Sequence, residues 1–218
     1  MLKAHAGITP EGRPAIFLCA LAALLAALLD SVPAAILFFL LTFFCCNFFR
    51  DPERVVPDAP GLAVSPADGR IVKIASMPDP FSGEPRQCVC IFMDLFSVHV
   101  NRSPTAGKIT NIAYHEGKFF NASLDKASGD NERCAYALED EDGKSWSMVQ
   151  IAGLVARRIV CRAEVGDRVR RGERIGMIKF GSRVDVYLPP GWQAKVAPGR
   201  KVLAGLSVIA EAEQKSAT

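Results

Sequence analysis

The strongest constraint in this sequence is a long apolar block near the N-terminus. Residues 15–49 are almost wholly apolar, and only Asp30-Ser31-Val32-Pro33 interrupts them. Each half holds about 15 residues and would span roughly 22 Å as a helix, whereas a bilayer core is about 30 Å thick. An aspartate at mid-membrane costs about 2.5–3.5 kcal/mol. We therefore expect two short helices, as a hairpin or a tilted anchor, with Asp30 at a polar boundary.

Basic residues flank this block on both sides. Lys3 and Arg13 precede it, and Arg50 and Arg54 follow it. Basic flanks stay in the cytoplasm, so both ends are expected on the cytoplasmic side, which favours a re-entrant hairpin. A cleaved signal peptide is the alternative, but the sequence around Asp30 is a poor small-residue cleavage site and more apolar sequence follows it.

The composition changes abruptly after Phe49, which predicts a helical membrane-associated segment at 1–49 and a second domain at 50–218. In the second domain, runs of four to eight residues rich in Val and Ile recur between Gly, Pro and Asp, which is typical of β-strands. One short helix is expected near Leu124–Ala127. The expected strands include Arg70–Ile74, Gln87–Met93, Lys108–Tyr114, Ser147–Ala152, Arg158–Ala163, Arg174–Phe180 and Val184–Leu188.

Internal similarity suggests a domain built from hairpins. Residues 65–74 and 103–112 both read S-P-x-x-G-[KR]-I-x-x-I, a turn that leads into a strand. Within residues 165–176 the sequence reads G-D-x-V-x-x-G-x-x-I, a pattern that resembles the hairpins of lipoyl- and biotinyl-type domains. We predict a mainly β, barrel-sandwich-like domain behind a hydrophobic helical anchor. Such patterns indicate fold and not function.

Charge and cysteine content exclude several classes of protein. The net charge is only +3, from 26 basic and 23 acidic residues, and no basic run is interleaved with aromatics, so we expect no nucleic-acid partner. The seven cysteines are odd in number and scattered, which argues against a disulfide framework. Cys88 and Cys90 would share one face of a strand as core residues. Without metal-ligand spacing we expect no metal, and a reducing compartment.

Taken one at a time, the residues that could do chemistry are unremarkable. His99 would lie on a polar strand face beside a turn, and His115 precedes the turn at Glu116-Gly117. Asp68-Gly69 is a common turn dipeptide, and Gly181-Ser182 also reads as a turn between two strands. None of them predicts a site alone.

In their order and spacing, however, several short stretches resemble the short bacterial form of phosphatidylserine decarboxylase. The resemblance extends from Phe48 to Val208 and also fits the apolar N-terminal block. The stretches are F-F-R-D-P-E-R at 48–54, S-P-A-D-G at 65–69, F-S-V-H-V-N-R-S-P at 96–104, Y-H-E-G-K-F at 114–119, N-A at 121–122, D-K-A-S at 125–128, N-E-R at 131–133 and I-K-F-G-S-R-V-D at 178–185.

The resemblance implies a proenzyme that cleaves itself between Gly181 and Ser182. The products would be a large β chain, residues 1–181, and a small α chain, residues 182–218. Ser182 would become a covalent pyruvoyl group, which forms a Schiff base with the substrate amine and needs no metal. Gly181 suits the step because glycine lets the backbone bend without a Cβ clash.

The family's self-cleavage uses an Asp-His-Ser set, which here maps onto Asp68, His99 and Ser182. His99 would be the base, since histidine exchanges its proton near neutral pH, and Asp68 would orient it. The long form of the family carries a second histidine three positions before His99, where this chain has Phe96. His115, His99 or a water molecule is then the candidate proton donor in turnover.

The implied substrate is phosphatidylserine in the membrane, with phosphatidylethanolamine as product. Arg102, Lys118 and Lys126 are candidates for binding the headgroup. The implied location is the cell membrane, peripheral or monotopic, facing the cytoplasm, and the two chains would form a heterodimer, with a higher homo-oligomer left open. Two alternatives remain: a pyruvoyl decarboxylase for a soluble amino acid, and a membrane-anchored adaptor with a lipoyl-like domain, which would need neither Gly181-Ser182 nor His99.

Overall fold

The computed structural model describes residues 7–117, 131–153, 158–179 and 181–213. The chain divides into two compact units, Met1–Glu53 and Arg54–Thr218. The short helix expected near residues 124–127 lies outside the described residues.

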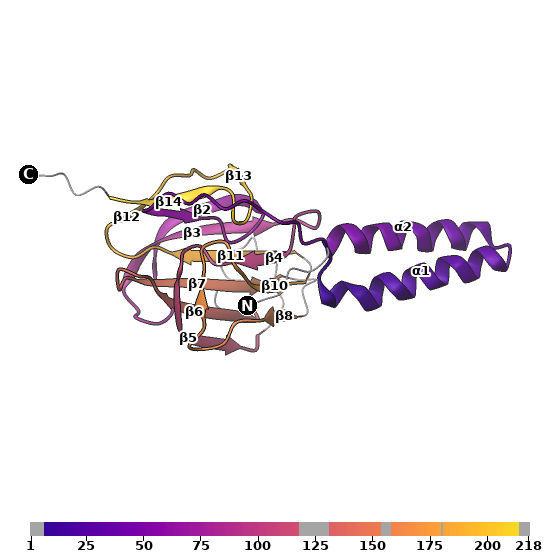
Figure 1. The fold of residues 1–218 in the computed structure, drawn as a ribbon, viewed down its shortest axis with the longest axis horizontal. Helices are drawn as coiled ribbons and strands as arrows, with labels where there is room; N and C mark the ends of the chain where they lie inside the picture. Colours follow the sequence, from indigo (N-terminus) through magenta and orange to yellow (C-terminus); the bar gives the residue numbers. More distant parts are fainter. Residues whose placement is uncertain (1–6, 118–130, 154–157, 180, 214–218) are drawn as a thin grey trace, which may run out of the picture. The chain divides into compact units, whose positions relative to one another are not determined.

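The first unit is a helical hairpin whose two long helices lie side by side (Figure 1). A proline in the first turn begins each long helix, where its missing N–H costs no hydrogen bond. Asp30 turns the chain between them in a left-handed conformation, with φ 55°. The backbone N–H of Thr9 donates to the Phe49 carbonyl at 2.9 Å and so closes the open end. The elements are η1 (Pro10–Gly12), α1 (Arg13–Leu28) and α2 (Val32–Phe48).

The hairpin surface is strongly apolar. Phe17, Leu28, Leu29, Phe39 and Phe43 each expose more than half of their surface. The helical stretch Pro10–Leu28 is long and apolar enough to cross a membrane, whereas Val32–Phe48 is apolar but shorter. An exposed apolar surface of this kind is typical of a membrane interaction site.

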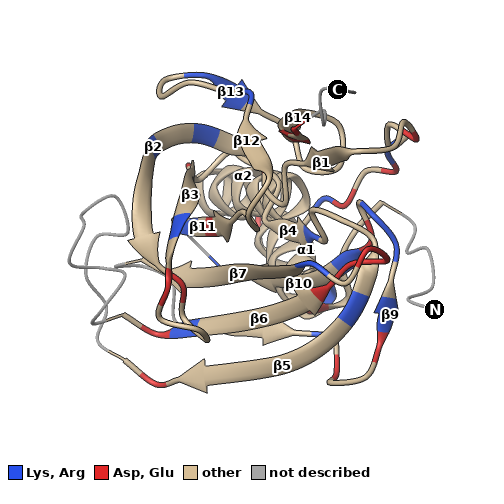
Figure 2. Ribbon diagram, turned by 90° about the vertical axis from the view of Figure 1, so that its left-hand side faces the viewer, with Lys and Arg blue, Asp and Glu red and all other residues tan. Residues whose placement is uncertain are grey.

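The second unit is built on an eight-stranded antiparallel sheet in the order β13-β2-β3-β11-β7-β6-β5-β9, which curls strongly (Figure 2). Two three-stranded sheets, β1-β14-β12 and β4-β10-β8, complete it. The strands are β1 (Leu62–Val64), β2 (Gly69–Pro78), β3 (Pro85–Met93), β4 (Val100–Arg102), β5 (Gly107–His115), β6 (Arg133–Glu139), β7 (Ser145–Ala152), β8 (Ile159–Cys161), β9 (Arg168–Val169), β10 (Arg174–Ile178), β11 (Ser182–Tyr187), β12 (Trp192–Ala194), β13 (Lys201–Val202) and β14 (Val208–Ala212).

The prediction of a mainly β domain behind an apolar helical segment is confirmed, and each expected strand overlaps an observed one. Strand β6 was not among them. Its sequence, R-C-A-Y-A-L-E, is rich in residues that do not favour strands. It pairs along its length with β5 and β7, and this tertiary context overrides the local preference.

The repeated motif S-P-x-x-G-[KR]-I builds two equivalent corners of the large sheet. Ser65 Oγ donates to the Ala67 carbonyl at 2.7 Å, and Ser103 Oγ donates to the Thr105 carbonyl at 2.6 Å. The register of β2 shifts after Ile71, and that of β5 shifts at the matching point after Ile109. The same residues therefore make the same turn and the same irregularity twice.

A second repeated segment completes each corner. Residues 166–172 and 199–205 both read G-x-[KR]-V-x-x-G. The first supplies β9 beside β5, and the second supplies β13 beside β2. The N–H of Gly172 donates to the Ser103 carbonyl at 2.8 Å, and that of Gly205 donates to the Ser65 carbonyl at 2.8 Å. The large sheet thus consists of two similar halves that meet between β11 and β7.

Buried apolar clusters lie on both faces of the large sheet. Strand β11 contributes side chains to both clusters, because alternate residues of a strand face opposite sides. Val184 and Val186 point into the main core, whereas Tyr187 lies in a smaller apolar cluster with Cys88 and Cys90. Ser182 shares the parity of Val184, so its side chain points toward the main core.

Candidate active site

Ser182 lies at a buried strand end. It begins β11, has no exposed surface and pairs with Met93 on β3 and Ala152 on β7. Its Oγ lies 3.3 Å from the Met93 Sδ, to which it donates. Gly181 has φ +47°, and a Cβ built there would meet no atom within 4 Å. Glycine is therefore favoured at the turn by its backbone conformation and not by crowding.

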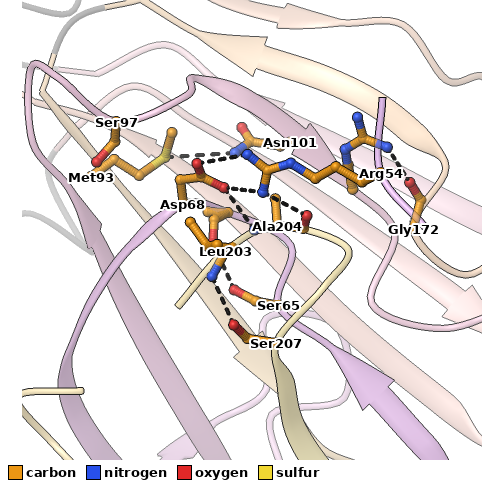
Figure 3. Close-up of polar contacts among 12 residues, drawn as sticks. Arg54, Ser65, Asp68, Met93, Ser97, Asn101, Gly172, Leu203, Ala204 and Ser207 are labelled. Carbon is orange, nitrogen blue, oxygen red and sulfur yellow. Dashed lines mark hydrogen bonds and ion pairs between the residues drawn. The ribbon is translucent and has the colours of Figure 1, made fainter. Parts of the chain in front are cut away.

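A chain of buried polar side chains runs away from this serine. Asn101 Nδ2 donates to the same Met93 Sδ at 3.6 Å (Figure 3). Gln150 Nε2 donates to Asn101 Oδ1 at 2.7 Å, and the Tyr136 hydroxyl donates to Gln150 Oε1 at 2.9 Å. Buried amides and hydroxyls of this kind hold one arrangement because each lost bond would leave a polar group unsatisfied. Met93, Gln150 and Tyr136 were not predicted as site residues.

His99 lies beside this chain, fully buried, directly before β4. Its Nδ1 is 2.8 Å from the Ser97 carbonyl oxygen. Because a carbonyl only accepts hydrogen bonds, Nδ1 carries the proton in this contact, and Nε2 is the basic nitrogen of the neutral ring. Alternate residues of an extended segment share a face, so His99 points to the same side as Asn101. The role of His99 as a base for Ser182 stays a prediction.

Asp68 forms a buried ion pair with Arg54. Arg54 Nη1 and Nη2 donate to its two carboxylate oxygens at 2.6 and 2.9 Å, and both side chains are only 8% exposed. The backbone N–H of Ala204 adds a third bond at 2.7 Å (Figure 3). Arg54 was expected only as a basic flank of the apolar block, although it lies in the F-F-R-D-P-E-R stretch.

The internal repeat shows that the turn itself does not need this carboxylate. Ala106 occupies the position in the second corner that Asp68 occupies in the first. The corner at Ala106 nevertheless keeps the serine-to-carbonyl bond and the register shift of its counterpart. Asp68 is therefore available for another role.

The segments that carry Asp68 and Ser182 flank the end of β3. Gly69, next to Asp68, lies against the Phe92 carbonyl on one side of β3, while Ser182 pairs with Met93 on the other side. The Arg102 N–H donates to the Pro66 carbonyl at 2.8 Å, which places β4 beside the Asp68 turn. The contacts of Asp68 described above are with Arg54 and Ala204, so its orientation of His99 stays a prediction.

His115 is not brought together with Ser182. It ends β5, is exposed and lines a cavity of about 270 Å³ with Arg133, Asp185 and Tyr187. Asp185 and Tyr187 lie on the sheet face opposite to the Ser182 side chain, by the alternation along β11. The placement favours His99 over His115 for proton transfer at Ser182.

The candidate headgroup residues have different positions. Arg102 is 5% exposed, and its Nη1 donates to the Gly172 carbonyl at 3.0 Å, which fixes it against the turn between β9 and β10. Lys118 and Lys126 lie outside the described residues.

One cluster among the described residues has metal-type ligands, on the face opposite Ser182. Single ligand atoms of Cys88, Cys90 and Asp185 all lie within 4.8 Å of one another. The Arg183 guanidinium holds both Asp185 oxygens, at 2.8 and 2.7 Å. Burial also raises the pKa of the Cys88 thiol well above its usual value. A fixed positive charge and protonated thiols both disfavour a cation, so we assign no metal there.

Comparisons with known proteins identify the family of this chain. Residues 41–210 match the sequence model of a family described as phosphatidylserine decarboxylase. The chain is 64% identical, over all of both chains, to a protein of Oleidesulfovibrio alaskensis named phosphatidylserine decarboxylase proenzyme. Proteins of the same name from Nitratidesulfovibrio vulgaris and Burkholderia ambifaria are 60% and 46% identical, over 96% of this chain and 97% and 98% of theirs. The chain therefore belongs to the phosphatidylserine decarboxylase family.

Proposed function

We propose that this chain decarboxylates phosphatidylserine to phosphatidylethanolamine after cleaving itself between Gly181 and Ser182. Family membership supports the reaction. The observation that carries the cleavage site is the position of Ser182, a fully buried serine that opens a strand directly after a glycine with φ +47°. Such a turn can bring the hydroxyl close to the preceding carbonyl carbon, which is what an acyl shift requires.

Ser182 and His99 can perform the cleavage with their own atoms. His99 Nε2 takes the proton of the Ser182 hydroxyl, and the oxygen attacks the Gly181 carbonyl carbon. The peptide C–N bond then breaks, the nitrogen takes the proton, and an ester joins the two segments. A base then removes the Cα proton of residue 182 and the Cβ–O bond breaks, which frees the Gly181 carboxylate and leaves dehydroalanine at position 182. Water adds to the imine form of this residue and ammonia leaves, so that a chain of residues 1–181 is separated from one that begins at residue 182.

The mature site would carry a pyruvoyl group derived from Ser182, whose carbonyl would condense with the substrate amine and accept the electrons left when the carboxylate is lost as CO2. The residues present fit such a group, because the Ser182 position is buried and bordered by Met93, and Gly181 leaves its surroundings open. We assign His99 as the residue that holds and returns a proton there. Burial of the site excludes bulk water from that proton.

The helical hairpin supports a membrane location. Its exposed apolar surface suits a monotopic anchor on the cytoplasmic face of the cell membrane, which holds the phospholipid substrate. Asp30, at the turn between the helices, would then lie near a polar boundary. The two chains would remain paired as a heterodimer, because β11 is hydrogen-bonded between β3 and β7. We also propose that the Val165–Gly176 hairpin resembles the hairpins of lipoyl-type domains.

Replacing Ser182 tests the proposal. Ser182→Ala should leave a single uncut chain and release no CO2 from phosphatidylserine vesicles. Ser147→Ala is the matched control, since Ser147 is a buried serine on β7 of the same sheet, and it should cleave and decarboxylate normally. Decarboxylation by Ser182→Ala would show that another residue carries the chemistry. Release of CO2 from free serine but not from the lipid would favour the soluble-substrate alternative.

A further inference from the structure

Two cysteines outside the proposed chemistry lie unusually close together. Cys134 on β6 and Cys161 on β8 have their sulfur atoms 2.7 Å apart. Another thiol pair in the same chain, Cys88 and Cys90, has its sulfurs 3.9 Å apart, which is an ordinary non-bonded contact. A disulfide bond is about 2.0 Å long. The Cys134 and Cys161 sulfurs are therefore closer together than those of the non-bonded pair, and their separation is nearer to the length of a disulfide bond.

We propose that Cys134 and Cys161 are a modification site, at which a small-molecule disulfide such as oxidised glutathione converts the two thiols into a reversible intramolecular disulfide. This bond would join β6 of the eight-stranded sheet to β8 of a three-stranded sheet. It is distinct from a structural framework, because the remaining cysteines of the described residues are free.

The two thiols differ in the way that a reactive pair requires. Cys161 is exposed, whereas Cys134 has no exposed surface. The hydrogen bond between the two thiols lowers the pKa of Cys161 to about 7, and the same bond with burial raises the pKa of Cys134. A thiolate with a pKa near the ambient pH is the best attacking group in disulfide exchange. Cys161 is thus the residue that a reagent reaches first, and Cys134 is the residue that resolves the intermediate.

The exchange balances in two steps. The Cys161 thiolate attacks one sulfur of oxidised glutathione, the glutathione S–S bond breaks, and one glutathione thiolate leaves. Cys134 then attacks the Cys161 sulfur, the mixed disulfide breaks, and the second glutathione leaves as a thiolate that takes up the Cys134 proton. Two protein thiols are oxidised by two electrons, and one molecule of oxidised glutathione is reduced to two of the thiol form.

The pair lies beside the proposed active site. Cys134 is directly opposite Gln150 in the β6–β7 pairing. The Gln150 amide connects Tyr136 to Asn101, which contacts the Met93 sulfur next to Ser182. A disulfide at Cys134 would therefore form next to the polar chain that leads to the Met93 sulfur beside Ser182.

Peptide mapping of the full-length protein in glutathione buffers tests the proposal. After trypsin digestion, Cys134 lies in the peptide 134–144 and Cys161 in the peptide 159–162, while Cys88 and Cys90 share the peptide 87–102. We expect a cross-link between 134–144 and 159–162 that grows as the buffer becomes more oxidising and disappears with excess dithiol. The peptide 87–102, the internal control, should stay reduced in the same samples. Absence of the cross-link in every buffer, or prior oxidation of 87–102, would overturn the proposal.

Two variants test the order in which the two thiols react. Cys134→Ser should stall the exchange, so that glutathione stays bound to Cys161. Cys161→Ser should leave Cys134 unmodified, because it is buried. Stable glutathione on wild-type Cys161 without the cross-link, or equal modification of Cys134 in the Cys161→Ser variant, would refute the assigned order of attack.

Discussion

The buried ion pair between Arg54 and Asp68 provides a quantitative test of the site. Asp68→Asn preserves the shape of the side chain and an acceptor for the Ala204 N–H, but leaves the Arg54 charge without its counter-ion. Removing one partner of a buried ion pair costs about 3–5 kcal/mol. We expect the lower end, about 3 kcal/mol, because the asparagine oxygen can still accept one bond from the guanidinium.

The stability assay should use a chain that cannot cut itself. In a Ser182→Ala background, thermal unfolding followed by near-ultraviolet circular dichroism should show a Tm lower by roughly 6–12 °C for Asp68→Asn, since each kcal/mol shifts a protein of this size by about 2–4 °C. Arg54→Met, which keeps the apolar stem and removes the charge, should lower the Tm by a similar amount. A change below about 2 °C for either variant would refute the burial argument.

The same two variants separate a structural role of Asp68 from a role at the site. In the Ser182 protein, the proposal expects Asp68→Asn to block self-cleavage, while Arg54→Met, equally destabilised, still cleaves below its Tm. The reasoning fails if the two variants cleave at the same rate. Asp68 would then act only as the counter-ion of Arg54.

Further predictions concern stability and reactivity. Gly181→Ala should lower the free energy of unfolding by only roughly 1–2 kcal/mol. The φ of +47° strains an alanine, but no neighbour lies within 4 Å of the new Cβ. Gly69→Ala should cost about 3 kcal/mol or more, because its Cβ would lie 2.1 Å from a carbonyl oxygen of the next strand; equal Tm values would contradict this difference. Tyr136→Phe should cost about 1–3 kcal/mol by urea unfolding, as it leaves buried Gln150 Oε1 without its donor, and no change would show that water replaces the hydroxyl. Because the pKa of Cys161 is lowered to about 7, its alkylation rate should rise as the pH rises through 7, and a midpoint near 9 would refute the lowered pKa.

Much of the architecture could be predicted from local patterns. Turn residues and β-branched runs marked the strands, and the S-P-x-x-G-[KR]-I motif marked the two corners. The second copy of the G-x-[KR]-V-x-x-G segment, at 199–205, was missed because its two variable positions before the final glycine, Leu203 and Ala204, are apolar, whereas those of the first copy are arginines. Strand β6 was missed because its residues prefer other structure and only pairing with neighbours decides its conformation.

The site itself was predicted through resemblance more than through residue chemistry. Gly181-Ser182 reads as one turn among many until the structure shows that the serine is buried at a strand end. The partner of Asp68 could not be predicted, because Arg54 is 14 positions away and nothing local links the two. The polar chain through Gln150 could not be predicted either, since its members come from separate strands that only the sheet order brings together.

The central claim is that this chain makes its own reactive group at Ser182. Intact-mass measurement of the purified, active protein tests it most directly. We predict two chains, residues 1–181 and residues 182–218, with the smaller one lacking a free amino group and having the mass of a pyruvoyl-capped peptide. An active preparation that contains only the single uncut chain, or a small chain that begins with an ordinary serine, would contradict it.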